Sequence, residues 1–131
     1  MIVTGAFLAD HAESRENKLY VEGGAWRSAD IPNTRVPTLV LLLDSGPDDS
    51  GTTFKLVIEM TSPDGADRVI AEGDMVVTDR AAFGVIPNFQ FPLNAGSGRY
   101  GFRCRIDGRQ EMPAAFGLDV TVDEDWLRQN Q

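Results

Sequence analysis

Strict alternation of apolar and polar residues over positions 99–106 is the feature that most constrains how this chain folds. Successive side chains of a β-strand point to opposite faces of the sheet, so a period of two buries one face and leaves the other in water. The pattern predicts a strand here and argues against a helix. Its two sets are Tyr100, Phe102, Cys104 and Ile106 on the inward face, and Arg99, Gly101, Arg103 and Arg105 on the outward face.

Turn signals recur at short intervals along the rest of the sequence. They are rich in Gly, Pro, Asn, Asp and Ser, which favour turns through their backbone conformation or their short side-chain hydrogen bonds. They leave little room for helices between them. The main ones are residues 23–24, 31–33, 45–48, 62–65, 94–98 and 107–108, and the expected strands are 2–8, 18–23, 35–44, 53–62, 68–78, 85–92, 98–106 and 115–123.

A chain of 131 residues is the usual size of one domain with one core. About eight sequential strands predict an all-β fold: an antiparallel two-sheet sandwich, immunoglobulin-like or C2-like, with Greek-key connections. A closed β-barrel is the alternative architecture. We expect residues 1–123 to form the single sandwich domain and residues 124–131 to form a polar tail that carries Trp126 and Leu127. This tail is expected to be either a helical turn or a frayed end.

Two hairpins are expected from neighbouring strands. Asp107-Gly108 favours a tight turn between strands 98–106 and 115–123, and residues 62–65 join strands 53–62 and 68–78. Gly73 is expected to mark a β-bulge, because glycine inside a strand often does.

Three aromatic residues stand near loop signals. Pro87 and Pro92 bracket Phe89 and Phe91, which predicts an edge strand with two aromatic anchors. Trp26 follows two glycines and is predicted to anchor the core, with an exposed binding residue as the alternative.

The charge and cysteine content narrow the classes of function. A net charge of −8 disfavours nucleic-acid and anionic-membrane binding, both of which need an excess of Lys and Arg. Cys104 is the only cysteine, so no internal disulfide requires an oxidising compartment. The first residues lack the positive start of a signal peptide, and no apolar run reaches the roughly twenty residues of a membrane helix. We expect a cytoplasmic protein.

Two stretches near the start carry a resemblance to a known family. Residues 7–13 read Phe-Leu-Ala-Asp-His-Ala-Glu, and residues 18–26 read Lys-Leu-Tyr-Val-Glu-Gly-Gly-Ala-Trp. With residues 98–102 and 107–108, they resemble a family of short uncharacterised bacterial proteins. The resemblance implies a bacterial β-sandwich protein and no activity that can be carried over.

Asp10, His11 and Glu13 are a candidate metal site, since a histidine flanked by two carboxylates could ligate a metal or act as a base. His11 is the only histidine, however, and transition-metal sites usually use further His or Cys ligands. A hydrogen-bonded histidine at a strand end is the alternative.

Asp44, Asp48 and Asp49 form a second candidate, because C2-like domains hold calcium with carboxylates on end loops. The alternative is a solvated turn in which Asp, Ser and Gly serve backbone geometry. No other cofactor is expected.

Arginines on the outer face of strand 98–106 form a basic stripe that could dock an acidic partner or a phosphate. Cross-strand pairing with carboxylates is the alternative. The stripe contains Arg99, Arg103 and Arg105, with Arg109 beyond it, and the expected carboxylates are Glu59, Glu111 or Asp119.

The leading hypothesis for function is a noncatalytic protein-binding or assembly module. Residues 36–43 are apolar on both faces, and Leu39, Leu41 and Leu43 are expected to need cover from a protein partner or a second copy. A calcium-dependent or carbohydrate-binding sandwich is the alternative, followed by a small metal-dependent hydrolase. We expect that the protein is not an enzyme, since no Gly-x-Ser-x-Gly motif occurs and Cys104 lies on the predicted core side of its strand.

Overall fold

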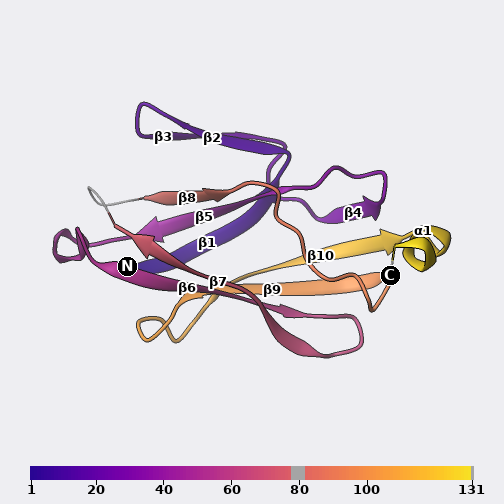
Figure 1. Cartoon of the computed structure of the whole chain (residues 1–131). Helices are drawn as coiled ribbons and strands as arrows, with labels where there is room; N and C mark the ends of the chain where they lie inside the picture. The colour runs from indigo at the N-terminus through magenta and orange to yellow at the C-terminus, as the bar shows by residue number, and fades with distance from the viewer. Residues whose placement is uncertain (78–81, 131) are drawn as a thin grey trace.

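The computed structural model describes residues 1–77 and 82–130 of the chain. Within these residues the chain forms ten β-strands, one short 3₁₀ helix and one α-helix (Figure 1). The elements are β1 (Ile2–Ala9), β2 (His11–Arg15), β3 (Lys18–Glu22), β4 (Ser28–Ile31), β5 (Thr38–Asp44), η1 (Pro47–Asp49), β6 (Thr53–Thr61), β7 (Asp67–Val76), β8 (Phe83–Ile86), β9 (Gly98–Ile106), β10 (Ala114–Val122) and α1 (Glu124–Gln129).

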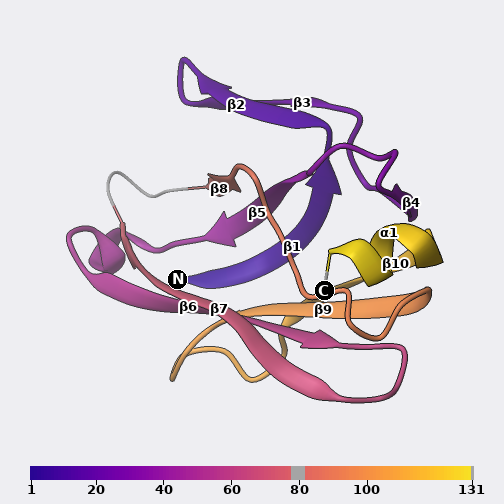
Figure 2. The same cartoon turned by 45° about the vertical axis from the view of Figure 1, so that its right-hand side comes forward.

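The strands form two facing sheets and a separate hairpin. One sheet has the order β1-β5-β8, the other has the order β4-β10-β9-β6-β7, and β2 and β3 form a two-stranded sheet of their own. The β2–β3 hairpin lies over the outer side of the three-stranded sheet, away from the five-stranded sheet (Figures 1 and 2). The predicted antiparallel sandwich is confirmed, although β4 pairs with β10 in parallel.

The strand count differs from the expected eight at two places. Residues 11–15 and 28–31 form β2 and β4, which the sequence pattern left in loops. Both segments are short and mostly exposed, so neither has the alternation that reveals a half-buried strand.

The main core lies between the two sheets. The inward side chains of β9, including Tyr100, Phe102 and Cys104, are completely buried, as predicted from their alternation. The β9–β10 hairpin is also confirmed. The prediction of a tight turn at residues 107–108 is wrong. β9 ends at Ile106 and β10 begins at Ala114, so residues 107–113 form a longer connection.

The β6–β7 hairpin is confirmed, but its bulge is not at Gly73. Gly73 pairs with Leu56 in regular register. The register shifts after Ile58, whose partner is Ala71, while the next residue of β6 pairs with Val69. The extra residue is therefore Ile70, which is partly buried against the core.

The expected edge strand 85–92 is shorter and earlier than predicted. β8 ends at Ile86, and Asn88 has a positive φ of 54°, which ends the extended conformation. Phe89 and Phe91 still anchor this segment, since both rings contact Phe102 with centroid distances of 5.9 and 5.0 Å.

The tail forms a short helix, α1, which is the helical alternative expected for it. Asp123 caps α1 by accepting a hydrogen bond from the backbone N–H of Trp126 at 2.9 Å. Trp126 and Leu127 pack against the core, which fixes the helix on the end of the sandwich. Residue 78, the expected end of one strand, and residue 131 of the expected tail lie outside the described residues.

Among the described residues, α1 is too short to cross a bilayer, and no other helix has the necessary length and apolar character.

Candidate functional site

The first predicted metal site does not assemble. The Asp10 carboxylate accepts a hydrogen bond from Trp26 Nε1 at 2.9 Å, while Glu13 forms an ion pair with Arg15 at 3.2 Å. His11 lies on β2, paired with Glu22. Nowhere in residues 1–77 and 82–130 do three or more His, Cys, Asp or Glu side chains gather closely enough to hold a metal. Asp10 serves instead to position an indole ring.

The acidic loop also uses its best-placed carboxylate for structure. Asp49 Oδ2 accepts hydrogen bonds from the Met1 amino group at 2.8 Å and from the Gly46 N–H at 2.9 Å. These bonds, the first of them the stronger influence, lower the pKa of Asp49 below its ordinary value. Asp44 and Asp48 are exposed and do not join Asp49 in a cluster of ligands within the described chain.

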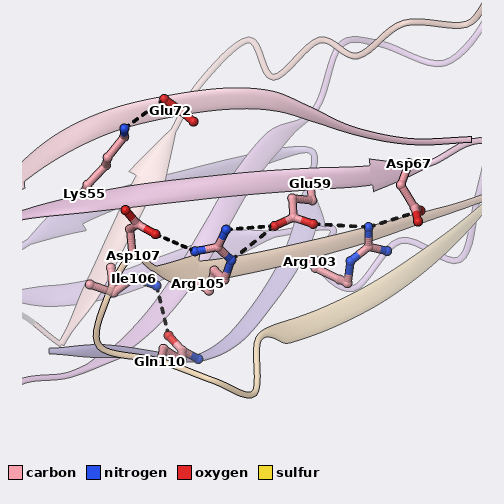
Figure 3. A network of polar contacts seen from close by, with 9 residues as sticks. All are labelled: Lys55, Glu59, Asp67, Glu72, Arg103, Arg105, Ile106, Asp107 and Gln110. Carbon is pink, nitrogen blue, oxygen red and sulfur yellow. Dashed lines mark hydrogen bonds and ion pairs between the residues drawn. The ribbon is translucent and has the colours of Figure 1, made fainter.

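The arginine stripe is paired with carboxylates of the same sheet, as the cross-strand alternative predicted. Glu59 lies between two of its arginines: Arg105 Nη2 is 3.1 Å from Glu59 Oε1, and Arg103 Nη2 is 3.6 Å from Glu59 Oε2 (Figure 3). Arg99 pairs with Asp119 at 3.0 Å.

Two further carboxylates extend this network. Asp107 accepts from Arg105 at 2.9 Å, and Asp67 lies 3.4 Å from Arg103 (Figure 3). The bonds to Asp107 and then to Glu59 raise the pKa of Arg105. This face of the sheet therefore neutralises its own charges and offers little unpaired charge to a ligand.

The three leucines expected to need a partner face the interior. Leu39, Leu41 and Leu43 are buried in the core between the sheets, so the prediction that they form an uncovered face is wrong. The register with β1, in which Leu41 pairs with Ala6, sets this orientation.

The outer face of β5 belongs to the even positions instead. Val40 is buried beneath the β2–β3 hairpin in a small second core with Ala9 and Ala12. Leu42, further along β5, remains 39% exposed. The chain itself thus covers most of the second apolar face of β5.

Cys104 is not available as a nucleophile in the folded state. Its side chain is completely buried, and this burial raises the pKa of the thiol to about 12. A reactive cysteine needs a thiolate near neutral pH, so the predicted packing role is the one that its surroundings support.

The sequence did not reveal a pocket that is lined in part by residues of β4 and α1. These two elements lie near each other at one end of the sandwich (Figure 2). The pocket has a volume of about 340 Å³ and is partly open to solvent. Its walls come from β4, the 32–37 segment, the 89–93 segment and α1, together with Trp26 and with Leu118 of β10. We call it the aromatic pocket, after the aromatic members of its lining: Trp26, Phe89, Phe91 and Trp126.

Hydrogen bonds hold several walls of the aromatic pocket in place. The Trp26 indole N–H donates to Asp10 and also to the Gly23 carbonyl at 2.9 Å. The Phe89 N–H donates to the Pro37 carbonyl at 2.9 Å, which ties the two loop segments together. The pocket is therefore built on anchored backbone rather than on free loops.

The start of α1 is tied to β4 in the same way. The Asp123 N–H donates to the Ile31 carbonyl at 3.0 Å, so the wall that contains Trp126 is joined to the wall that contains Ile31. Thr34 closes the next turn, accepting from the Asp30 N–H at 2.7 Å.

The lining is apolar except at a few positions. Thr34, Arg35 and Gln90 supply its polar side chains, and Arg35 is the only charged residue among the described residues that line it. No carboxylate of residues 1–77 or 82–130 forms an ion pair with Arg35. Apolar walls with a small number of polar groups are typical of ligand pockets, and this volume lies near the lower end of their usual range.

The sequence contained a partial signal for this pocket. Trp26 and Trp126 each stand in a polar or glycine-rich stretch outside any alternating strand, where a large aromatic side chain has no sheet position to fill. Nothing in the sequence showed that they meet at one end of the fold.

The fold and this pocket define a small antiparallel β-sandwich with an aromatic pocket at one end. The chain belongs to a family of unknown function, DUF6941, whose model matches residues 4–129. This match confirms the expected membership of an uncharacterised family and extends through α1. A search among curated proteins found no match.

Proposed function

We propose that this chain is a noncatalytic protein-binding module and that the aromatic pocket holds an apolar side chain of its partner. The observation that carries the proposal is the pocket itself: four aromatic rings on anchored walls around a volume of about 340 Å³. Burying one large apolar side chain contributes roughly 1.5–3 kcal/mol. Because the pocket is partly open, the rest of the partner would cover its mouth and add further contact.

The arrangement of the other candidate residues supports a binding role rather than catalysis. The carboxylates near His11 and Asp49 serve in hydrogen bonds and ion pairs, and Cys104 is buried and neutral. The aromatic pocket brings together no acid–base pair or nucleophile, since its polar side chains are a threonine, an arginine and a glutamine.

Two exposed valines offer a matched test. Val36 lines the aromatic pocket and is 48% exposed, whereas Val69 lies on β7 and is 50% exposed. Val36→Glu places a carboxylate at the pocket, and Val69→Glu makes the same change elsewhere. Neither removes a buried side chain, so both variants should fold.

The experiment compares tagged wild-type protein and both variants as baits in a lysate of the source cells, followed by titration of the purified partner. We expect a stoichiometric partner that Val69→Glu retains and that Val36→Glu binds at least about tenfold more weakly, because a carboxylate must be desolvated at an apolar contact. Equal binding by both variants, or no stoichiometric partner, would count against the pocket. Light scattering shows whether the partner is a second copy.

A further inference from the structure

The aromatic pocket combines two requirements that a ligand must meet together. Its walls are apolar, while Arg35 contributes a guanidinium with no ion pair among the described residues. An apolar occupant that covered Arg35 would remove water from it and leave its donors without acceptors, which costs free energy. An occupant with a carboxylate next to its apolar group avoids that loss, because a carboxylate accepts charge-assisted hydrogen bonds from a guanidinium.

The three arginines of the stripe already have carboxylate partners. Arg103 and Arg105 share Glu59, and Arg99 has Asp119, so an incoming carboxylate would have to compete with partners that are already in place. The chain as a whole carries a net charge of −8 and repels anions at long range. Arg27, Arg68 and Arg109 also have no ion pair among the described residues, but of these four arginines only Arg35 lines the aromatic pocket.

We infer that the aromatic pocket takes the C-terminal residue of a partner polypeptide, with its apolar side chain between the aromatic walls and its terminal carboxylate on Arg35. This inference rests on the proposed function and names the part of the partner that is bound. The last residue of a chain carries an apolar side chain and a carboxylate on the same Cα. An internal apolar residue has only neutral backbone carbonyls of its own to offer to Arg35, so a carboxylate would have to come from a neighbouring side chain. Capture of a terminal carboxylate is a recurring mode of peptide recognition.

A pair of probes isolates the carboxylate. N-acetyl-phenylalanine has the side chain and terminal carboxylate of a C-terminal residue, and N-acetyl-phenylalanine amide has a neutral carboxamide of similar size in place of that carboxylate. Both are titrated to millimolar concentration into the ¹⁵N-labelled protein while the indole N–H signals of Trp26 and Trp126 are followed by NMR. The same titrations are repeated on Arg35→Met and on Arg68→Met. Arg68 lies on β7 outside the lining of the pocket, so its variant is a control with the same change in charge.

We expect the acid to bind at least about tenfold more tightly than the amide, which is the smaller end of what one hydrogen bond to a charged group provides. Arg35→Met should remove this preference, and Arg68→Met should keep it. If the acid and the amide shift the indole signals with equal affinity, the pocket binds apolar groups but not chain ends, and this inference fails while the proposed function stands. If neither probe shifts them, the inference fails and the pocket loses its support as the binding site.

A third probe separates a polypeptide end from a free acid. 3-Phenylpropionate carries a ring and a carboxylate but no peptide group, whereas a pentapeptide that ends in phenylalanine presents the same groups on a chain. We expect the pentapeptide to bind more tightly, because its preceding residues cover the open mouth of the pocket. Tighter binding of 3-phenylpropionate would assign the pocket to a small carboxylic acid and overturn the inference.

Discussion

Truncating either of two adjacent leucines of β5 tests which face of that strand is the interior. Leu41 is 0% exposed and lies in the core between the sheets, whereas Leu42 is 39% exposed on the outer face. Leu41→Ala should leave a cavity among packed neighbours. Leu42→Ala should remove a side chain that already contacts water on one side.

The two costs can be estimated separately. Truncation of a fully buried leucine to alanine costs about 2–5 kcal/mol, because the lost transfer free energy is increased by the cavity that remains. Full burial of a leucine side chain is worth about 1.5–3 kcal/mol, so a side chain in the position of Leu42 retains only part of this, about 1 kcal/mol, with no closed cavity. We therefore expect Leu41→Ala to lower the free energy of unfolding by about 2 kcal/mol more than Leu42→Ala.

Urea denaturation followed by circular dichroism measures this difference. A domain of this size loses about 1–3 kcal/mol of stability per molar urea, so the two midpoints should differ by about 1 M. Leu41→Val, a smaller truncation, provides the comparison if the alanine variant is already unfolded without urea. Equal losses, or a larger loss for Leu42→Ala, would show that the faces of β5 are assigned the wrong way round.

Three further predictions concern charged and titrating groups. Glu59→Gln should lower the free energy of unfolding by about 1–2 kcal/mol, because Glu59 is only 28% exposed and serves two arginines, while Glu72→Gln at an exposed pair should cost below about 0.5 kcal/mol in the same urea assay. Burial raises the pKa of Cys104 to about 12, so this thiol should resist a disulfide reagent in the native state and react once the protein is unfolded. The stability that the neutral thiol contributes is present below the pKa of the unfolded state, and it should fall as the pH rises above about 9. The pKa of Asp49 is lowered, so the stability that its carboxylate contributes is present above the pKa of the unfolded state and is lost as the pH falls through the pKa of the folded state. Asp49→Asn should therefore weaken the dependence of the free energy of unfolding on pH in the acid range. An unchanged dependence would contradict the role of the hydrogen bond between Asp49 and the Met1 amino group.

The strands that could be predicted from the sequence are those with one face exposed to solvent and the other face buried. β9 alternates arginine or glycine with large apolar residues, so its period fixes both its conformation and its inward face. β5 has no such contrast, because both of its faces are apolar. The sequence identified it as a strand with a covered outer face, but only its register with β1 decides that Leu41 faces inward and Val40 faces the hairpin.

The candidate sites also differ in how far the sequence could predict them. The pairing of Arg105 with Glu59 could be anticipated because both lie on neighbouring strands, where opposite charges are in reach of each other. The aromatic pocket could not, since it joins Trp26, Phe89 and Trp126 from loops and a terminal helix. The conformations of these segments depend on tertiary hydrogen bonds. A local sequence pattern does not predict such bonds.

The contrast between the charged sheet face and the aromatic pocket supports our proposal that a partner binds at the end of the sandwich. A partner that docked on the sheet would have to desolvate the pairs that join Arg103 and Arg105 to Glu59, and it could offer these arginines no better acceptor than the one they have. At the pocket, water is displaced from apolar rings and from Arg35, which has no such acceptor among the described residues. Under this proposal, association at the pocket gains apolar burial and a new charge-assisted hydrogen bond without breaking an existing ion pair.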